Sequence, residues 1–314
     1  MMLQHRYRNA APLDRFAAVA ALMLLFAHGK SAQASDGAHL GDWSGSFSTS
    51  RTEQADADLD SGGEVGLSRS AFALSARRQW SPRIGIGASF RYEYNGWDFS
   101  DPAAFGGIAP WQDIHRASLG FQLRAKLNDN WQLIAAPTLQ YAGEDGAKSS
   151  DAMSYGAALA FSRKYGTDLS VGFGAAVLHD IDETKIRPYL AVSWQIDEHW
   201  RLGNPEAAGP AGLAGFEVGY RRNERWDFGA GFGFSEYRFR LDDRGPTAGG
   251  VGESRSLPLY GRISYRPNTL MRFDAYAGSS FNNRVRVEYG DGRGTVSEDY
   301  DAAPIAGIAV TFSP

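Results

Sequence analysis

The chain has 314 residues, a formal net charge of -4 and no cysteine. Without cysteine there are no disulfides, no thiolate metal site, no cysteine nucleophile and no lipid-bearing cysteine. The acidic balance argues against nucleic acid as a partner, and beyond the first residues no apolar run reaches the roughly 20 residues that a membrane-spanning helix needs.

Residues 1–34 have the pattern of a secretory signal peptide. A stretch with three arginines precedes the apolar run 16–27, and the small-residue motif Ala32-Gln33-Ala34 follows it. We predict cleavage before Ser35 and a single mature domain, residues 35–314. Cleavage removes four basic residues and one acidic residue, so the formal charge moves from -4 to -7.

The mature sequence alternates apolar and polar residues with a period of two, which is typical of β-strands and not of helices. In residues 168–178, Leu169, Val171 and Phe173 share one face, whereas Gly172 and its alternate neighbours share the other. The segments with this pattern are 42–50, 64–78, 83–95, 114–127, 131–142, 154–164, 168–178, 186–196, 199–204, 213–222, 226–240, 254–265, 270–280 and 303–313. Such strands can present one face to lipid and hide the other.

The predicted fold is therefore all-β: a transmembrane antiparallel up-and-down barrel of about fourteen strands, with twelve as the alternative if residues 199–204 do not pair. Short turns are predicted at 81–82, 128–130, 165–167, 197–198, 223–225 and 267–269, and they alternate with longer connections at 51–63, 96–113, 143–153, 179–185, 205–212, 241–253 and 281–302. In outer-membrane barrels the short turns are periplasmic. We expect a Gram-negative outer-membrane location with both termini in the periplasm.

Aromatic residues next to the short turns give a second line of argument, because amphipathic rings concentrate where hydrocarbon meets headgroups. The predicted periplasmic girdle consists of Trp43, Trp80, Trp131, Tyr165, Trp200, Trp226, Tyr265 and Phe312. The alternative is that these are ordinary hairpin-end aromatics of a soluble sheet.

The last strand places Ala306, Ile308, Val310 and Phe312 on its lipid face. It resembles the C-terminal signal that barrel assembly machinery recognises, although here Ser313 and Pro314 follow the aromatic residue. We therefore expect that machinery as a partner during biogenesis, and outer-membrane lipid and lipopolysaccharide as partners afterwards.

Two stretches carry a resemblance to a known family: GPAGLAGFEVGYRRNERWDFGAGFGFSEYRFRLDD at 209–243 and RISYRPNTLMRFDAYAGSSF at 262–281. They resemble a family of uncharacterised Gram-negative outer-membrane β-barrel proteins, known only as a domain of unknown function. The resemblance implies location and fold, and it implies no catalytic residues.

The polar face of the strands is the expected functional surface, because in a barrel it lines the interior. Its predicted lumen-lining charges are Arg91, Glu93, Arg116, Arg124, Lys126, Arg187, Glu217, Arg221, Arg262, Arg272 and Asp274. Basic groups outnumber acidic ones, which predicts a weak preference for anions. The alternative is that the arginines pair with carboxylates and stiffen the interior. Segment 281–302 is a further candidate to fold inward and constrict the lumen.

Two functions stay open: a porin-like channel for passive diffusion of small solutes, and a closed barrel with a structural or surface-interaction role through its outer loops. A barrel-embedded hydrolase is a more remote alternative, because His115, His179 and His199 accompany no serine-containing motif. No cofactor, metal site or nucleic-acid partner is expected. Transport of small apolar substrates would need an apolar interior or a lateral opening, and the charged inward face argues against it.

Overall fold

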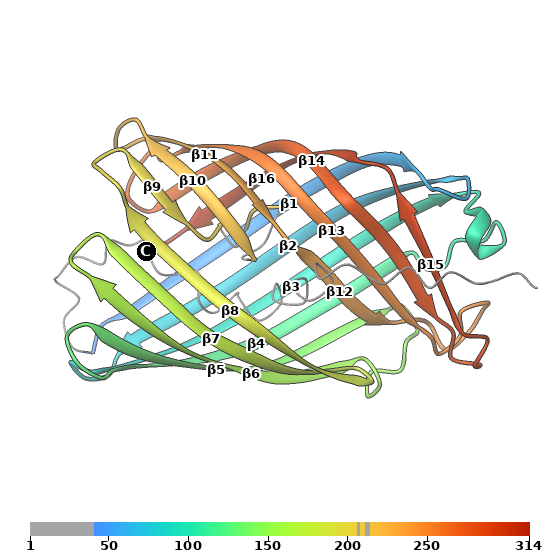
Figure 1. Ribbon diagram of the computed structural model, residues 1–314, viewed down its shortest axis with the longest axis horizontal. Helices are drawn as coiled ribbons and strands as arrows, with labels where there is room; N and C mark the ends of the chain where they lie inside the picture. The colour runs from blue at the N-terminus through green and yellow to red at the C-terminus, as the bar shows by residue number, and fades with distance from the viewer. Residues whose placement is uncertain (1–40, 206–207, 211–213) are drawn as a thin grey trace, which may run out of the picture.

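The computed structural model describes residues 41–205, 208–210 and 214–314 (Figure 1). The predicted signal peptide, residues 1–34, lies outside this part of the chain. The strands are β1 Trp43–Asp58, β2 Glu64–Gln79, β3 Ile84–Ser100, β4 Asp113–Lys126, β5 Trp131–Glu144, β6 Met153–Tyr165, β7 Leu169–Asp180, β8 Glu183–Gln195, β9 Trp200–Gly203, β10 Gly215–Arg221, β11 Trp226–Gly233, β12 Ser235–Arg240, β13 Val251–Tyr265, β14 Met271–Glu288, β15 Thr295–Tyr300 and β16 Ala303–Phe312. A 3-10 turn, Ala103–Phe105, precedes β4. Among the described residues, no helix is long and apolar enough to span a membrane.

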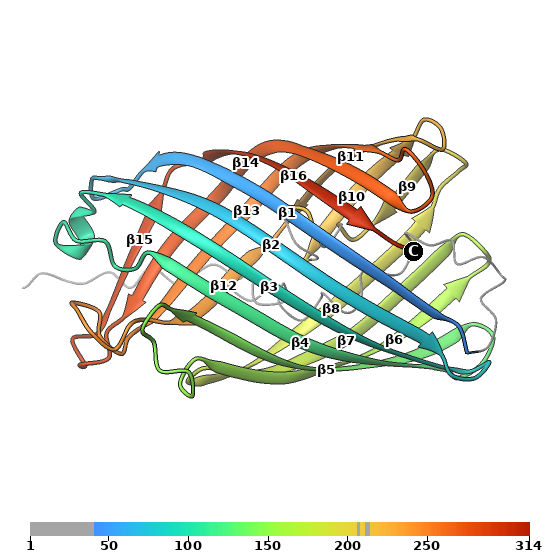
Figure 2. The same cartoon turned by 180° about the vertical axis from the view of Figure 1, so that it is seen from behind.

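These segments form one closed antiparallel barrel, because β1 pairs with β16 as well as with β2 (Figures 1 and 2). β11 and β12 continue one another and both pair with β13, and β15 and β16 both pair with β14. If β11 with β12, and β15 with β16, are each counted as one strand, the barrel has fourteen strands. The short β9 pairs with β8 and with β10, so the fourteen-strand prediction is confirmed over the alternative of twelve.

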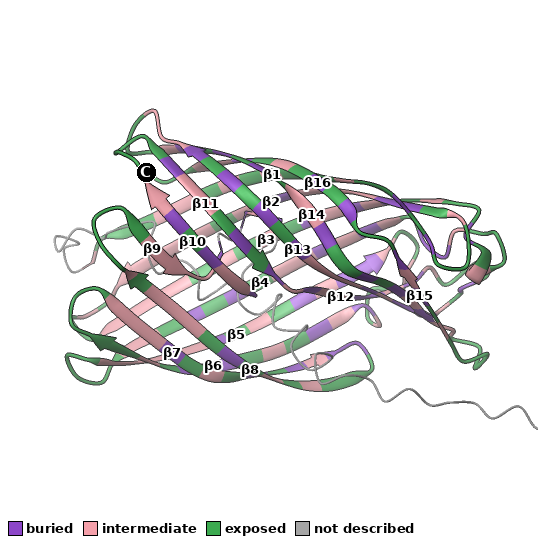
Figure 3. Cartoon of the chain, turned by 45° about the horizontal axis from the view of Figure 1, so that its top comes forward, coloured by how far each residue is buried: buried purple, intermediate pink, exposed green. Residues whose placement is uncertain are grey.

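The outer surface of the barrel carries the apolar set of each strand, as the alternating pattern predicts. In β7, Phe173 and Val177 are exposed, whereas Ala176 between them is buried. Figure 3 shows the same alternation of exposed and buried positions along the other strands. Large apolar side chains exposed in such number are stable only against hydrocarbon, and the closed sheet leaves few backbone groups unpaired there. The fold is a transmembrane barrel.

A repeated side-chain cap forms five of the six short turns at one end of the barrel, here called the turn end; the turn between β6 and β7 has Gly166 at positive φ instead. Asn223 Oδ1 accepts hydrogen bonds from the backbone N–H groups of Arg225 and Trp226. The same cap recurs at Ser81, Asn128, Asp197 and Asn268. Asn and Asp favour this geometry because their side chains mimic a backbone turn. The motif Asn/Asp-x-x-Trp therefore fixes both the turn and the position of the aromatic residue after it.

The opposite end, the loop end, differs from the prediction in three connections. β1 extends to Asp58, so the connection predicted at 51–63 shrinks to 59–63. The connection predicted at 179–185 is a two-residue turn at Ile181–Asp182, so the predicted alternation of long and short connections is wrong there. Most of segment 281–302 is a hairpin in which β14 pairs with β15. Polar residues at these positions lie in strands that extend beyond the membrane into water, and they do not end the strands.

We predict that Asn223→Ala lowers the free energy of unfolding by about 1 to 2 kcal/mol, because two backbone donors lose their acceptor. Urea unfolding of the barrel in lipid vesicles measures the change. Asn223→Asp keeps an acceptor oxygen and serves as the control. Equal losses in both variants would mean that the cap does not stabilise the turn.

Candidate functional site

The loop end of the barrel interior is filled by apolar side chains, here called the plug. Its buried members are Ala57, Leu59, Val65, Trp97, Trp111, Ile114, Ala142, Phe239, Leu241, Val285, Val287, Tyr300 and Ala303. Trp111, from the connection between β3 and β4, meets Phe239 of β12 with ring centroids 5.0 Å apart. Both side chains are 1% exposed. The plug therefore closes the straight path along the barrel axis at this end.

β12 reaches the plug by running inside the wall. Its residues Tyr237 and Phe239 face the interior, where Tyr237 lies against the Arg116 guanidinium and Phe239 against Trp111. Its opposite face meets the inner face of β8, since Glu236 binds both Lys185 and Arg187. A strand whose outer face contacts the inner face of another strand must lie inside it.

The inner course of β12 ends at β5, on the other side of the interior. Arg240 pairs with Gly143 of β5 in a parallel bridge. Beyond it, Glu144 accepts hydrogen bonds from the backbone N–H groups of Asp242 and Gln112. At the loop end, β1 to β5 and β12 to β15 thus form a closed inner ring around the plug. β6, β7 and β8 are left outside this ring.

The wall is interrupted where β8 departs from the ring. β8 pairs with β9 only at Ser193, Trp194 and Gln195. Beyond these residues the side chain of Asn204 takes the place of a partner strand. Its Oδ1 accepts a hydrogen bond from Val192 N at 3.1 Å. Its Nδ2 donates to the carbonyl oxygens of Leu190 and Gly215 at 3.4 and 3.0 Å.

Pro188 lies further along the same edge of β8. Backbone groups of a strand alternate in direction, and Val192 turns its N–H toward Asn204. Pro188 is in phase with Val192, so the missing N–H of Pro188 falls on the free edge. Proline in a sheet is confined to such edges, because it cannot donate to a ladder. The sequence is therefore built for an edge strand at this point.

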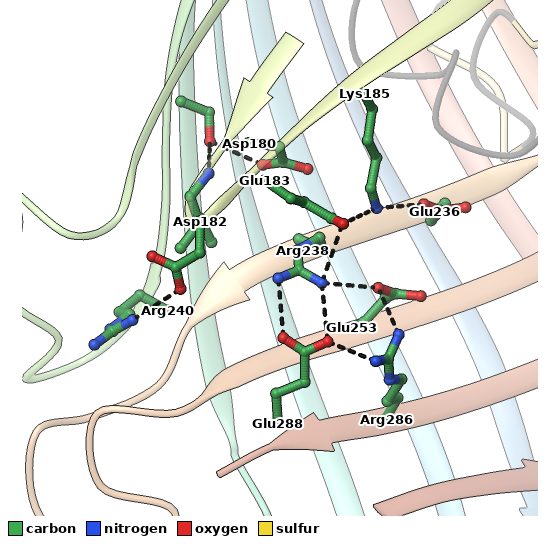
Figure 4. Close-up of polar contacts among 12 residues, drawn as sticks. Asp180, Asp182, Glu183, Lys185, Glu236, Arg238, Arg240, Glu253, Arg286 and Glu288 are labelled. Carbon is green, nitrogen blue, oxygen red and sulfur yellow. Dashed lines mark hydrogen bonds and ion pairs between the residues drawn. The ribbon is translucent and has the colours of Figure 1, made fainter. Parts of the chain in front are cut away.

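Side-chain ion pairs close the interrupted stretch, here called the seam between β8 and β12 (Figure 4). Glu236 binds Lys185 at 3.3 Å and Arg187 at 3.1 Å, and Arg238 binds Glu183 at 3.3 Å. Arg240 binds Asp182 at 3.5 Å nearer the rim. Arg238 also binds Glu253 and Glu288 of β13 and β14, which fixes it to the ring.

Two further charge networks lie in the interior. Below the plug, Glu93 accepts ion pairs from Arg69, Arg91 and Arg116 at 3.6, 2.9 and 3.1 Å. A small cavity, lined in part by Arg69, Arg116 and Tyr237, lies next to this network. The carboxylate is 2% exposed, so its charge is balanced by side chains and not by bulk water.

Nearer the turn end, Arg262 is the centre of the second network. It donates to Glu217 at 2.6 Å and to Asp227 at 2.7 Å, and it lies 3.6 Å from Asp274. Arg201 also pairs with Asp227, and Arg272 with Asp274. Gly229 makes room for these groups, because a Cβ there would meet Glu217 and Arg262. Side chains of neighbouring strands thus occupy the space beside Gly229.

The predicted lumen-lining residues fall into different settings. The two networks bring together Arg91, Glu93, Arg116, Glu217, Arg262, Arg272 and Asp274. Arg187 belongs to the seam, and Arg124 donates to Gln122. Lys126 is exposed and Arg221 half-buried, both near the turn end. Most predicted residues therefore act as partners of one another.

The residues of the predicted aromatic girdle lie at the turn end of their strands. Trp43, Trp80, Tyr165, Trp200, Trp226 and Phe312 are exposed, and Trp131 and Tyr265 are half-buried. Trp226 pairs with Tyr265 across β11 and β13, with ring centroids 4.8 Å apart.

The histidines considered for catalysis lie apart from one another. His115 bonds Tyr92, His179 bonds Thr184, and His199 lies in an exposed turn beside Tyr220. His179 and Asp180 are strand neighbours, so they point to opposite sides of the wall. Among the described residues, no cluster of His, Cys, Asp and Glu has the arrangement of a metal site.

One described residue between β9 and β10 packs into the barrel interior. Ala208 packs against Tyr260, Tyr276, Ile305 and Ala309 of the interior face. Segment 281–302, the predicted candidate for an inward constriction, supplies Val285, Val287 and Tyr300 to the plug.

A closed sheet with an apolar exterior and a charged interior defines a transmembrane β-barrel of the outer-membrane class. The chain belongs to the family DUF6268, described as a domain of unknown function, whose model matches residues 80–245. The resemblance seen in the sequence is confirmed, although the match ends before its second stretch at 262–281.

No curated protein matches the chain. Solved structures with a similar fold include the COG4313 outer membrane channel from Pseudomonas putida F1, with 10% identity, a TM-score of 0.45, and coverage of 87% of this chain and 96% of that one. A FadL homologue from Pseudomonas aeruginosa has 12% identity, a TM-score of 0.42, and coverage of 86% and 89%. Similarity this distant assigns no function.

Sequence reasoning missed the residues that build the plug and the seam, above all Asn204, Glu236, Arg238 and Phe239. One signal was present: Glu236, Arg238 and Arg240 lie on the face of their strand that continues the lipid-facing residues of β11. Charges on a lipid face are costly. Their presence indicates that the strand leaves the wall.

We predict that Arg262→Met destabilises the barrel by about 3 to 5 kcal/mol, because it leaves three carboxylates buried without their shared cation. Urea unfolding in vesicles measures the loss. Arg51→Met breaks an exposed pair with Glu53 and should cost less than about 1 kcal/mol. Similar losses in the two variants would show that the Arg262 network has no special weight.

Proposed function

We propose that this protein is an outer-membrane channel for passive diffusion of small solutes, with its turn end and both termini facing the periplasm. The single observation that carries the proposal is the division of the loop end into a plugged ring and the separate strands β6 to β8. A barrel with a purely structural role needs no such division. The division supports a path beside the plug, between the ring and these strands.

The same proposal implies the partners that a barrel of this kind meets. Lipid and lipopolysaccharide contact its apolar belt, and barrel assembly machinery inserts it after export through the signal peptide. No enzymatic step is part of the proposal. The expected absence of an enzyme, a cofactor and a nucleic-acid partner stays a prediction.

We also propose that the channel has a weak preference for anions. Arg69 and Arg116 converge on the single carboxylate of Glu93 beside the small cavity. This local excess of positive charge favours anions. In contrast, the Arg262 network contains as many carboxylates as guanidinium groups when Arg201 and Arg272 are included. We therefore expect a small effect on the reversal potential and not a strongly selective pore.

The alternative, a closed barrel that acts through its loops, is favoured by one observation. The plug buries Trp111 and Phe239 almost completely, and Leu241, Val285 and Val287 completely. Side chains buried to this degree exclude water from the contacts between them.

Phe239→Ala tests the two functions, because it removes the largest side chain that β12 contributes to the plug. We expect wild-type protein in planar bilayers to show low conductance and Phe239→Ala to raise it severalfold, since the cavity joins the interior to the loop end. In a salt gradient, the reversal potential should shift weakly toward that of the anion.

Phe273→Ala is the matched control, because Phe273 faces lipid and is 41% exposed. Its conductance should equal that of wild type. Phe239→Leu, which leaves a smaller cavity, covers the case in which the alanine variant fails to fold. Folded variants without conductance would favour the closed barrel, and a cation-selective current would contradict the anion preference.

A further inference from the structure

We infer that the seam between β8 and β12 is a lateral exit through which small apolar molecules pass from the barrel interior into the bilayer. The inference rests on the proposed channel function and adds to its aqueous path a second route, for apolar molecules. Trp111 and Phe239 close the straight path at the loop end, so a solute must pass beside the plug, where the seam lies. The seam is the place where the wall lacks a strand ladder.

The two edges at the seam can separate without breaking either sheet. β8 keeps its full ladder to β7, from Glu183 to Trp194, and β12 keeps its ladder to β13. What joins them is a set of side-chain ion pairs centred on Glu236 and Arg238. Side chains change partner by rotation about single bonds, whereas a strand ladder must be unzipped.

Toward the turn end, the seam stops at Asn204. Asn204 bonds to Leu190 and Val192 of β8 and to Gly215 of β10 at the same time. Below it, β8, β9 and β10 pair in the usual way. Pro188 lies above it and offers no donor, so separation of the edges exposes one fewer unpaired N–H group to hydrocarbon.

The substrate class follows from the surroundings of the seam. Ile186 and Leu190, the lipid-facing residues of β8 beside it, are 71% and 50% exposed, and Phe232 on the other side is 39% exposed. These side chains belong to the apolar belt, so the seam opens toward acyl chains and not toward water. A polar solute would lose its hydration there, whereas an apolar solute gains by entering the bilayer.

The ion pairs at the seam can hold its two edges together reversibly. Lys185 on β8 faces Glu236, and Glu183 faces Arg238, so each edge carries both signs (Figure 4). Arg187 of β8 also pairs with Glu236. Opposite charges hold the edges together while no solute is present. Their inward position keeps the charges off the lipid surface, since Lys185 and Arg187 alternate with the exposed Ile186.

The test uses a reversible lock across the seam in a chain that has no native cysteine. Arg187→Cys and Glu236→Cys are combined and joined by a bis-methanethiosulfonate reagent, which a reductant removes. The full chain is expressed in cells with a periplasmic β-lactamase. Entry of N-phenyl-1-naphthylamine reports the apolar route, and hydrolysis of nitrocefin reports polar diffusion. Leu119→Cys with Leu139→Cys, a paired position in the intact ladder of β4 and β5, is the matched control.

We expect the lock to abolish protein-dependent entry of the apolar probe, to leave nitrocefin hydrolysis unchanged, and to be reversed by reductant, with no effect in the control pair. Unchanged apolar entry in the locked protein would overturn the lateral exit. Equal loss of both rates would also overturn it, because it would mean one shared aqueous path, and the channel function would stand. Neither probe entering faster in wild-type cells than in cells without the protein would instead refute the channel itself.

Discussion

The structure depends on one constraint: within hydrocarbon, a backbone N–H or C=O group needs a partner from the same chain. Strand ladders meet it along most of the wall that the structure describes. The exception begins above Val192, where β8 continues without β9 beside it. The Asn204 side chain supplies the next hydrogen bonds to β8, at Val192 and Leu190. Pro188, further along the same edge, has no N–H group to donate. The short β9, the inward course of β12 and the seam are all consequences of this one interruption.

The two closures at the loop end differ in strength. Each large apolar side chain of the plug gains roughly 1.5 to 3 kcal/mol by burial, and several pack together around Phe239. A single ion pair in contact with water gains at most about 1 kcal/mol, and even a more buried pair must offset the desolvation of both charges. The pair of Arg240 with the exposed Asp182 is therefore easier to exchange than the contacts of Phe239. If the molecule opens, the seam opens before the plug.

The sequence predicted the fold well because period-two alternation and capped turns are local properties. Leu169, Val171 and Phe173 reveal their lipid face without knowledge of any partner, and Asn223 with Trp226 marks a turn end. The path of β12 is not local. Residues 226–240 alternate without a break whether the strand stays in the wall or turns inside it, and the choice is made by Trp111 and Gly143, which lie about a hundred residues away.

The interior charges show why a count of residues on one face does not give the character of a site. Arg262 and Arg272 count as basic in such a tally, yet each is satisfied by carboxylates, and one of these, Asp227, is not among the predicted lumen-lining residues. The charged interior was also the argument against apolar substrates. A solute that travels along the axis would pass every inward residue. Where a wall is interrupted at Leu190 and flanked by Phe232, a solute meets only a short part of that interior before it reaches lipid, so the charge of the remaining face does not decide what the barrel transports.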